Sequence, residues 1–452
     1  MIRLFFLSVF VSCCFGNNKE LFVHLPVANS QISIYLAPSL SKEGGYSLEH
    51  YKILEKTLKA DITLSGRMIA ATQHDYKDFL LKNKPLKEAM LDPVWKQEKI
   101  DYILFANFDK QDASYSLYST CFSHSKSLKK LCFSGNLQQD RKSIHSLADQ
   151  IHKVLFNMDG IASTQILYTI QTPAPFASSD LKYQSTIWIC DYDGANARAL
   201  TAEHDYCITP CFYSSKKSTA PSFLYVSYHK GPSKIYHSPI DHFSGQPFIQ
   251  LKGNQMLPAL SKDRSKIAFI SDAAGQADLF VQAIHPEKGL LGKPIQAYSV
   301  PGAVQASPCF SPDGKKIAFV SDKEKTPRIY IIDTPSYAHK QQLPTAKCIT
   351  LKNKDNTSPS WSPDGKKIAY SSMTEGVRQI WIYDIETKEE SQLTFGKFHK
   401  ENPCWAPSSL HIVYNTADTD SSDLYMINLI DKAPVKFTQG PGRKHYPSWS
   451  RS

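Results

Sequence analysis

Aspartate, histidine and cysteine side chains are the groups in this sequence that could catalyse a reaction or hold a metal ion. Six aspartates lie at repeated positions: Asp272, Asp322, Asp333 and Asp384 follow apolar runs, and Asp313 and Asp364 lie between such runs. Asp313 and Asp364 lie in Ser-Pro-Asp-Gly segments, where an aspartate hydrogen-bonds nearby backbone and favours a turn. We therefore predict turn and strand-end roles for these carboxylates. The alternative is that some of them bind a metal ion or an anion in the central channel of a ring-shaped fold.

The 15 histidines form no His-Glu-x-x-His motif, and the sequence has no Gly-x-Ser-x-Gly, phosphate-binding loop or dinucleotide-binding fingerprint. Serine, histidine and aspartate residues from distant parts of a chain can still converge in an active site. Only three residues follow Trp449, so we expect no hydrolase domain after it. We predict no catalytic residue, no cofactor and no metal site.

Ten cysteines are present, and no pair has the Cys-x-x-Cys spacing of a zinc site. Cys121 and Cys132 flank a polar, lysine-rich stretch and form a candidate disulfide pair. Cys211, Cys309 and Cys404 each follow a proline at the same point of a repeat, which favours a small buried residue over a reactive one.

That repeat is the element that must position every candidate group. Its first strand contains a proline followed, two residues later, by an aromatic residue or leucine, and it occurs six times: Pro210, Pro258, Pro308, Pro359, Pro403 and Pro447. Successive prolines are 44 to 51 residues apart, the length expected for a four-stranded propeller blade. In the fullest copies a Ser-Pro-Asp-Gly turn follows, so the first two strands form a hairpin.

A second and a third strand also recur six times. The second contains the triplets that begin at Ile166, Phe223, Ile267, Ile317, Ile368 and Ile412, and the third is centred on Trp188, Tyr236, Phe280, Tyr330, Trp381 and Tyr425. The first repeat lacks its proline strand, whereas nothing follows the last one. We predict that the C-terminal strand pairs with the first repeat and closes a ring, which removes the exposed strand edges of an open array.

The fold class that follows is a small α/β N-terminal domain followed by an all-β six-bladed β-propeller. Residues 1–16 resemble a signal peptide, with Arg3 before an apolar run too short to span a bilayer. A lipoprotein site at Cys13 or Cys14 is the alternative. We assign residues 17–159 to the α/β domain and 160–452 to the propeller.

Within the α/β domain, short strands are predicted at residues 20–25, 31–36 and 102–105. Apolar residues at helical spacing predict helices around residues 48–58 and 144–158. A hairpin is predicted between residues 115–120 and 131–134.

Export, the α/β domain and the Ser-Pro-Asp-Gly-Lys-Lys-Ile-Ala-Phe/Tyr blades together resemble the TolB family, the periplasmic component of the Tol-Pal system of Gram-negative bacteria. Three further segments carry the resemblance: residues 187–196, residues 100–105 and residues 446–450. Three blade turns, at residues 214–217, 261–264 and 406–409, depart from the full motif.

The resemblance implies a periplasmic adaptor and no reaction. Family members bind the peptidoglycan-associated lipoprotein Pal on one face of the propeller and the inner-membrane protein TolA through an N-terminal segment, supporting outer-membrane integrity and constriction at cell division. The corresponding segment here is Glu20, Leu21, Phe22, Val23, His24 and Leu25. We expect a monomer that reaches membranes only through its partners. An exported propeller that binds a glycan or acts as a hydrolase is the alternative.

The formal net charge of +10 favours acidic partners and anionic surfaces. Part of it gathers at Lys126, Lys129, Lys130, Arg141 and Lys142, which we interpret as a solvated basic face. The aromatic residues recur at core positions of the blades and are not interleaved with this cluster, so we predict no nucleic-acid binding.

Overall fold

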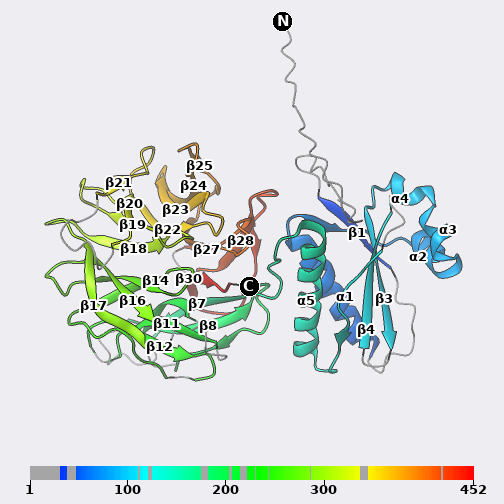
Figure 1. Ribbon diagram of the computed structural model, residues 1–452, viewed down its shortest axis with the longest axis horizontal. Coiled ribbons are helices and arrows are strands. Elements are labelled where there is room, and N and C mark those ends of the chain that lie inside the picture. The colour runs from blue at the N-terminus through cyan, green and yellow to red at the C-terminus, as the bar shows by residue number, and fades with distance from the viewer. Residues whose placement is uncertain are drawn as a thin grey trace, which may run out of the picture.

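The computed structural model describes residues 31–37, 47–109, 112–120, 125–174, 182–202, 206–213, 221–229, 231–242, 244–285, 287–335, 345–418 and 421–451. A ring of small sheets lies beside a smaller α/β part (Figure 1). The expected signal peptide, the segment at residues 20–25 and Cys121 lie outside the described residues. The signal peptide, the strand at 20–25 and the candidate disulfide therefore stay predictions.

The α/β part alternates helices and strands. In chain order they are β1 (Ile32–Leu36), α1 (Leu48–Leu64), β2 (Met68–Ala70), α2 (Asp75–Asn83), α3 (Leu86–Met90), α4 (Pro93–Gln97), β3 (Tyr102–Asp109), β4 (Asp112–Ser119), β5 (Ser125–Ser127), β6 (Leu131–Cys132) and α5 (Leu137–Phe156). The strands predicted near residues 31–36 and 102–105 and both predicted helices are confirmed.

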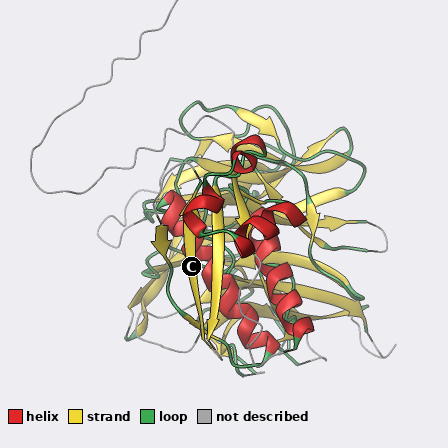
Figure 2. Ribbon diagram, turned by 90° about the vertical axis from the view of Figure 1, so that its right-hand side faces the viewer, coloured by secondary structure: helices red, strands yellow, loops and turns green. Residues whose placement is uncertain are grey.

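One sheet with the strand order β2-β1-β3-β4-β5 separates two layers of helices. Helices α1 and α5 lie between this sheet and the ring, whereas α2, α3 and α4 lie on its far side (Figures 1 and 2). Because successive strand residues point to opposite faces, Ile34 packs in the core shared with α1 and α5, while Tyr35 packs with Trp95 on the other side.

The predicted strands at residues 115–120 and 131–134 form as β4 and β6 and pair antiparallel, but they are not the two arms of one hairpin. The hairpin partner of β4 is β5, with Ser116 opposite Ser127, and β6 pairs instead with the start of β4, with Asp112 opposite Cys132. The polar segment at Ser125–Ser127 has no alternating apolar pattern, so its pairing leaves no signal in the sequence.

Six four-stranded antiparallel sheets form the ring. From the innermost strand outward, blade 1 is β30 (Arg443–Trp449), β7 (Gln165–Pro173), β8 (Tyr183–Asp191) and β9 (Arg198–Ala199); blade 2 is β10 (Cys207–Tyr213), β11 (Ser222–Ser227), β12 (Lys234–Pro239) and β13 (Gln246–Pro247); blade 3 is β14 (Gln255–Leu260), β15 (Lys266–Ser271), β16 (Asp278–His285) and β17 (Gly289–Tyr298). Blade 4 is β18 (Gln305–Phe310), β19 (Lys316–Ser321), β20 (Arg328–Asp333) and β21 (Lys347–Cys348); blade 5 is β22 (Asn356–Trp361), β23 (Lys367–Thr374), β24 (Val377–Asp384) and β25 (Glu390–Gln392); blade 6 is β26 (His399–Trp405), β27 (His411–Ala417), β28 (Leu424–Asn428) and β29 (Val435–Lys436). The six-bladed propeller with a small N-terminal α/β region is therefore confirmed.

The C-terminal strand completes the first blade. β30 pairs antiparallel with β7, with Trp449 opposite Ile166. The Trp449 indole Nε1–H donates to Thr164 Oγ1 at 2.7 Å, and the Ser450 N–H donates to the Gln165 carbonyl at 2.8 Å. The division of the chain at residues 159 and 160 falls between the end of α5 and the start of β7, and it stays a prediction.

Paired aromatic side chains explain why the repeat is visible in the sequence. In every blade the aromatic residue of the second strand lies directly opposite the aromatic residue of the third: Tyr168–Trp188, Tyr225–Tyr236, Phe269–Phe280, Phe319–Tyr330, Tyr370–Trp381 and Tyr414–Tyr425. Such pairs stabilise a sheet by roughly 0.2–1 kcal/mol each relative to a pair of alanines. The Tyr414 and Tyr425 rings are stacked with centroids 6.0 Å apart.

The blade turns need a left-handed residue at their fourth position. In the fifth blade the Gly365 N–H donates to the Ser362 carbonyl at 2.9 Å, and Gly365 has φ +79°. The divergent turns of blades 3 and 6 keep this geometry with Arg264 at φ +62° and Ser409 at φ +56°. The loss of glycine therefore changes the sequence motif and leaves the turn in place.

No helix within the described ranges is both long and apolar enough to cross a membrane.

Candidate functional site

The inner strand of each propeller blade contains a residue with positive φ, which the sequence does not predict. In each blade the residue before the repeat proline has positive φ, between +46° and +53°: Thr209, Leu257, Ser307, Ser358, Asn402 and Tyr446. The register with the second strand shifts at the same point in all six blades. None of these residues is glycine, so the conformation costs on the order of 1–3 kcal/mol at each.

These six bulges and their prolines line a cavity of about 150 Å³ on the propeller axis. The polar groups in it are neutral. The Ser358 hydroxyl donates to Asn402 Oδ1 at 3.0 Å, and Asn402 Nδ2 donates to Asn415 Oδ1 at 2.8 Å. No carboxylate is among the lining residues, so the cavity as described offers no pair of acids for hydrolysis.

The repeated cysteines follow the same prolines. Burial raises the pKa of the Cys309 thiol to about 12 and that of Cys404 to about 11. A thiol that stays protonated at neutral pH is a poor nucleophile and a poor metal ligand. These three cysteines are partly buried, and the raised thiol pKa values favour their interpretation as small packing residues over reactive ones. No cluster of three or more His, Cys, Asp or Glu suited to a metal occurs among the residues the structure describes.

The two faces of the propeller differ. On one, which we call the turn face, lie the turns between first and second strands and the connections between third and fourth strands. On the other, the loop face, lie the connections from each blade to the next. The α/β part contacts the turn face: His411 Nε2 donates to the Leu64 carbonyl at 2.8 Å, and the Tyr192 hydroxyl donates to Asp61 Oδ1 at 2.6 Å.

A shared apolar core joins the two parts, and buried polar groups add to this contact. His145 Nδ1 donates to Asp61 Oδ2 at 2.8 Å, and both side chains are almost fully buried. Burial raises the pKa of Asp61 although His145 and Tyr192 hydrogen-bond to it. Burial also lowers the pKa of His145, but the hydrogen bond and charge of Asp61 outweigh this effect, so the His145 pKa is raised overall.

Arg141 belongs to the same contact. Its Nη1 donates to Thr57 Oγ1 at 2.6 Å and its Nη2 pairs with Asp193 of the first blade. The interpretation of Arg141 as part of a solvated basic face was therefore wrong, because the guanidinium joins the two parts of the molecule.

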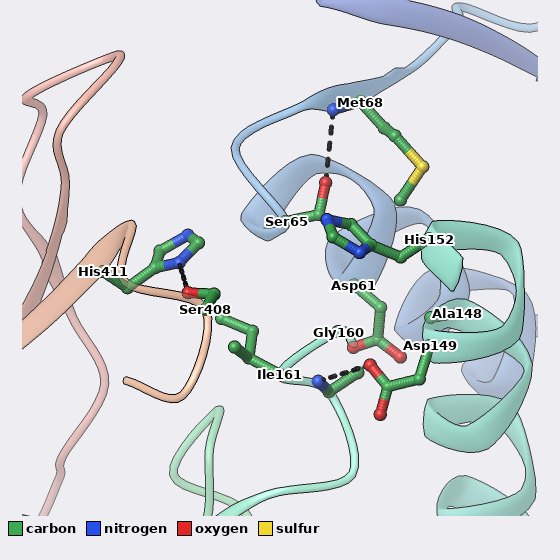
Figure 3. A pocket seen from close by; sticks show the side chains of 11 residues that line it. Asp61, Ser65, Met68, Ala148, Asp149, His152, Gly160, Ile161, Ser408 and His411 are labelled. Carbon is green, nitrogen blue, oxygen red and sulfur yellow. Dashed lines mark hydrogen bonds between the residues drawn. The ribbon is translucent and has the colours of Figure 1, made fainter. Parts of the chain in front are cut away.

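A small cavity of about 10 Å³, room for about one water molecule, lies between the two parts (Figure 3). His411 and Ser408 approach it from blade 6, and His152 and Asp149 approach it from α5. The contact is therefore closely packed, which leaves the loop face as the more accessible end of the ring.

Exposed apolar side chains gather on that loop face. Val304, Leu351, Phe395 and Phe398 lie on the three successive connections between blades 3 and 4, 4 and 5, and 5 and 6; we call this set the apolar arc. Leu351 is 72% exposed and Phe395 is 71% exposed. Large apolar residues gathered on neighbouring loops are typical of protein-binding surfaces.

Hydrogen bonds hold the arc in place. Thr350 and Thr394, which precede Leu351 and Phe395, each accept at Oγ1 a hydrogen bond from a third-strand N–H, at 3.0 and 2.8 Å. The Leu351 N–H donates to Glu390 Oε1 at 2.9 Å. These loops are therefore pre-organised, which lowers the entropic cost of binding a partner.

Hydrogen bonds also fix the connection between blades 5 and 6 and the connection between blades 3 and 4. Gln379 Nε2 donates to the Gly396 carbonyl at 2.7 Å, and Lys400 Nζ donates to the Phe398 carbonyl at 2.9 Å. The Val304 N–H donates to Asp322 Oδ1 at 2.7 Å.

Exposed lysines rim the arc. Lys352, Lys354 and Lys397 lie on the same connections, and none forms an ion pair with a carboxylate within the described ranges. The carboxylate of Asp355 in this region pairs with Arg378 at 2.8 Å. The surface is thus apolar with a basic rim, which complements a partner that has apolar and acidic groups.

Comparison with known proteins places this geometry in a family. The family model described as the TolB beta propeller domain matches residues 152–452. This chain belongs to the TolB family. The Protein TolB homolog of Protochlamydia amoebophila is 43% identical over 381 residues, covering 84% of this chain and 81% of that protein.

More distant relatives are also members of the TolB family. The Protein TolB homolog of Chlamydia caviae is 39% identical over 271 residues, which cover 60% of this chain and 61% of that protein. The crystal structure of TolB from Acinetobacter baumannii matches with a TM-score of 0.73 and 21% sequence identity, covering 94% of this chain and 97% of that one. This structural likeness shows the fold of the TolB family.

The predicted TolA-binding residues 20–25 lie outside the described residues, so the structure does not test them. Sequence reasoning missed the apolar arc, because its four members are single exposed residues in loops without periodicity. The signal that could have located it is the residue after each blade-ending threonine, which is leucine at 351 and phenylalanine at 395.

Proposed function

We propose that this protein acts in the Tol-Pal system as a monomeric periplasmic adaptor that binds a Pal-like lipoprotein and a TolA-like inner-membrane protein. Membership of the TolB family supports the Tol-Pal role. The observation that carries the proposal further is the apolar arc, a pre-organised and basic-rimmed surface that lies away from the α/β part. We assign Pal binding to this loop face.

The alternative, a propeller that binds a glycan or acts as a hydrolase, has less support. It requires an open polar pocket with converging carboxylates, whereas the axial cavity is small and is lined by prolines and neutral side chains.

Calorimetric titration with the periplasmic domain of Pal from the same organism tests the proposal. We expect saturable one-to-one binding by the mature chain, and at least tenfold weaker binding by the Leu351→Ser/Phe395→Ser variant, because loss of a few central apolar contacts costs roughly 1–2 kcal/mol or more. The matched control is Leu91→Ser/Phe79→Ser, which removes the same residue types from exposed positions of the α/β part. Equal weakening by both variants, or no binding by the unaltered chain, would contradict the assignment.

TolA binding is assigned to residues 20–25, whose charged start and apolar alternation match the family segment. Removal of residues 17–25 should abolish binding of the periplasmic domain of TolA and leave Pal binding within twofold. Retention of TolA binding by the shortened chain would place that site elsewhere.

A further inference from the structure

The outermost strand of blade 3 differs from those of the other five blades. β17 has ten residues, whereas β9, β13, β21, β25 and β29 have two or three. β17 lies on the outside of the ring (Figure 1). Blade 3 therefore has a longer outer edge than its neighbours.

The strand register places a set of side chains on one face of this blade. Lys266 lies opposite Ala283, and Ala283 lies opposite Leu291. One pair further along, Val281 lies opposite Ile295. Because directly opposed residues share a face, these five side chains lie on the same side of the sheet.

That face lines a cavity of about 430 Å³ between blades 3 and 4, which we call the β17 groove. Val281, Ala283 and Ile295 form its apolar wall, and Pro335 and Lys315 of blade 4 lie across from them. The volume and the mainly apolar lining fall within the range of sites for small ligands. Leu291, 38% exposed, continues the apolar face outward.

Two ammonium groups adjoin the groove. Lys266 and Lys315 both line it, and neither forms an ion pair with a described carboxylate. The neighbouring carboxylates form hydrogen bonds of their own: Asp263 accepts from the Ser261 and Ser265 hydroxyls, Asp313 from the Ser311 hydroxyl and the Lys315 backbone, and Asp333 pairs with Lys316. The charges of Lys266 and Lys315 also act on Asp263 and Asp313, without forming an ion pair.

We propose that the β17 groove binds a small anionic amphiphile, with its apolar body on Val281, Ala283 and Ile295 and its acidic head at Lys266 and Lys315. An added peptide strand fits less well, because the register breaks between Leu291 and Ile295, where Pro294 lacks an N–H to donate. This site is separate from the apolar arc and does not depend on partner binding.

Calorimetric titration with sodium decanoate tests the site on the full mature chain. We expect saturable one-to-one binding with a dissociation constant on the order of 1 mM or tighter, as expected for a ligand of this size. Decanol, which lacks the charge, should bind at least tenfold more weakly. Equal binding of decanol would overturn the role of the lysines.

Three variants locate the site. Lys266→Gln/Lys315→Gln should weaken decanoate binding at least tenfold, and Ala283→Trp should block it by filling the groove. The charge-matched control Lys252→Gln/Lys262→Gln alters two exposed lysines that do not line the groove and should bind as the unaltered chain does. Circular dichroism and thermal unfolding establish that each variant is folded.

The apolar arc is the competing surface for such a ligand. The Leu351→Ser/Phe395→Ser variant should keep decanoate binding within twofold. Loss of binding in that variant with retention in Ala283→Trp, or equal weakening by both lysine pairs, would overturn the proposal.

Discussion

His411 of blade 6 joins the propeller to the α/β part through a hydrogen bond, and its protonation state affects stability. Its Nε2–H donates to the Leu64 carbonyl, and the Ser408 hydroxyl donates to Nδ1 at 3.1 Å. This pattern requires the neutral imidazole, and burial lowers the pKa of His411 to about 4. The bond to Leu64 itself favours the protonated ring, so the cost of protonation comes from burying the charge between α1 and blade 6.

The pH dependence of stability follows from that pKa. The unfolded chain binds the proton below pH ~6.5, whereas the folded chain resists it down to about pH 4, so stability is lost as pH falls through this window. By pH 5 the loss amounts to about 2 kcal/mol. In urea unfolding between pH 7 and pH 5, His411→Gln should lose less stability than the unaltered chain. The control His242→Gln, at an exposed position, should follow the unaltered chain; identical pH profiles for His411→Gln and the unaltered chain would contradict the prediction.

The role of a single residue could be predicted from the sequence where its partners lie close to it in the chain. Asp364 accepts hydrogen bonds from the Ser362 hydroxyl at 2.6 Å and the Lys366 N–H at 3.0 Å, so its predicted turn role is confirmed. Arg141 was misjudged because its partners, Thr57 and Asp193, are distant in sequence. The positive φ of the six residues before the prolines was also invisible, since a residue in that position favours extended backbone.

The closing strand is the element on which the ring depends. β30 is paired with β7 and also contacts the inner strands of blades 2 and 6. Without it, β7 and β26 would both lose a packed neighbour and blade 1 would expose an unpaired edge.

Removal of residues 446–452 should lower the unfolding temperature by on the order of 10 °C or more. The deletion removes buried Trp449 and its bond to Thr164; loss of such a core side chain costs roughly 3–5 kcal/mol, and each kcal/mol shifts the midpoint by roughly 2–4 °C. Differential scanning calorimetry measures the midpoint. A chain that lacks only residues 451 and 452 is the control. If both shortened chains melt alike, the closing role of β30 is wrong.

At the level of elements, the propeller was predictable because one structural demand, an aromatic pair between the second and third strands, is repeated six times. The helices α2, α3 and α4 were not predicted. Two of them have only five residues, and their position depends on burial of Trp95 against Tyr35, with ring centroids 5.4 Å apart. Tertiary packing of that kind leaves no periodic pattern in a short segment.

At the scale of the whole molecule, the α/β part packs against the turn face at blades 1 and 6 and leaves the loop face accessible. Gly66 lies at the centre of this arrangement with φ +74°. A Cβ atom at this position would lie 1.5 Å from Asn428 Nδ2. Asn428 cannot shift freely, because its Oδ1 accepts a hydrogen bond from the Ile430 N–H at 2.7 Å.

Gly66→Ala should therefore destabilise the contact between the two parts. The control Gly376→Ala shares the left-handed conformation, at φ +83°, and has open space around its Cβ. Each substitution incurs a backbone cost of about 1–2 kcal/mol, and only Gly66→Ala adds the clash. We expect faster proteolytic cleavage near residues 157–164 in Gly66→Ala alone. Equal cleavage of the two variants would show that Gly66 does not fix the contact.

Hydrogen exchange with and without the periplasmic domain of Pal tests most directly the central claim that the loop face binds this partner. Bound Pal should slow amide exchange in residues 299–304, 349–355 and 393–398, which carry the apolar arc, and leave α2, α3 and α4 unchanged. Protection confined to the α/β part or to the turn face would contradict the account.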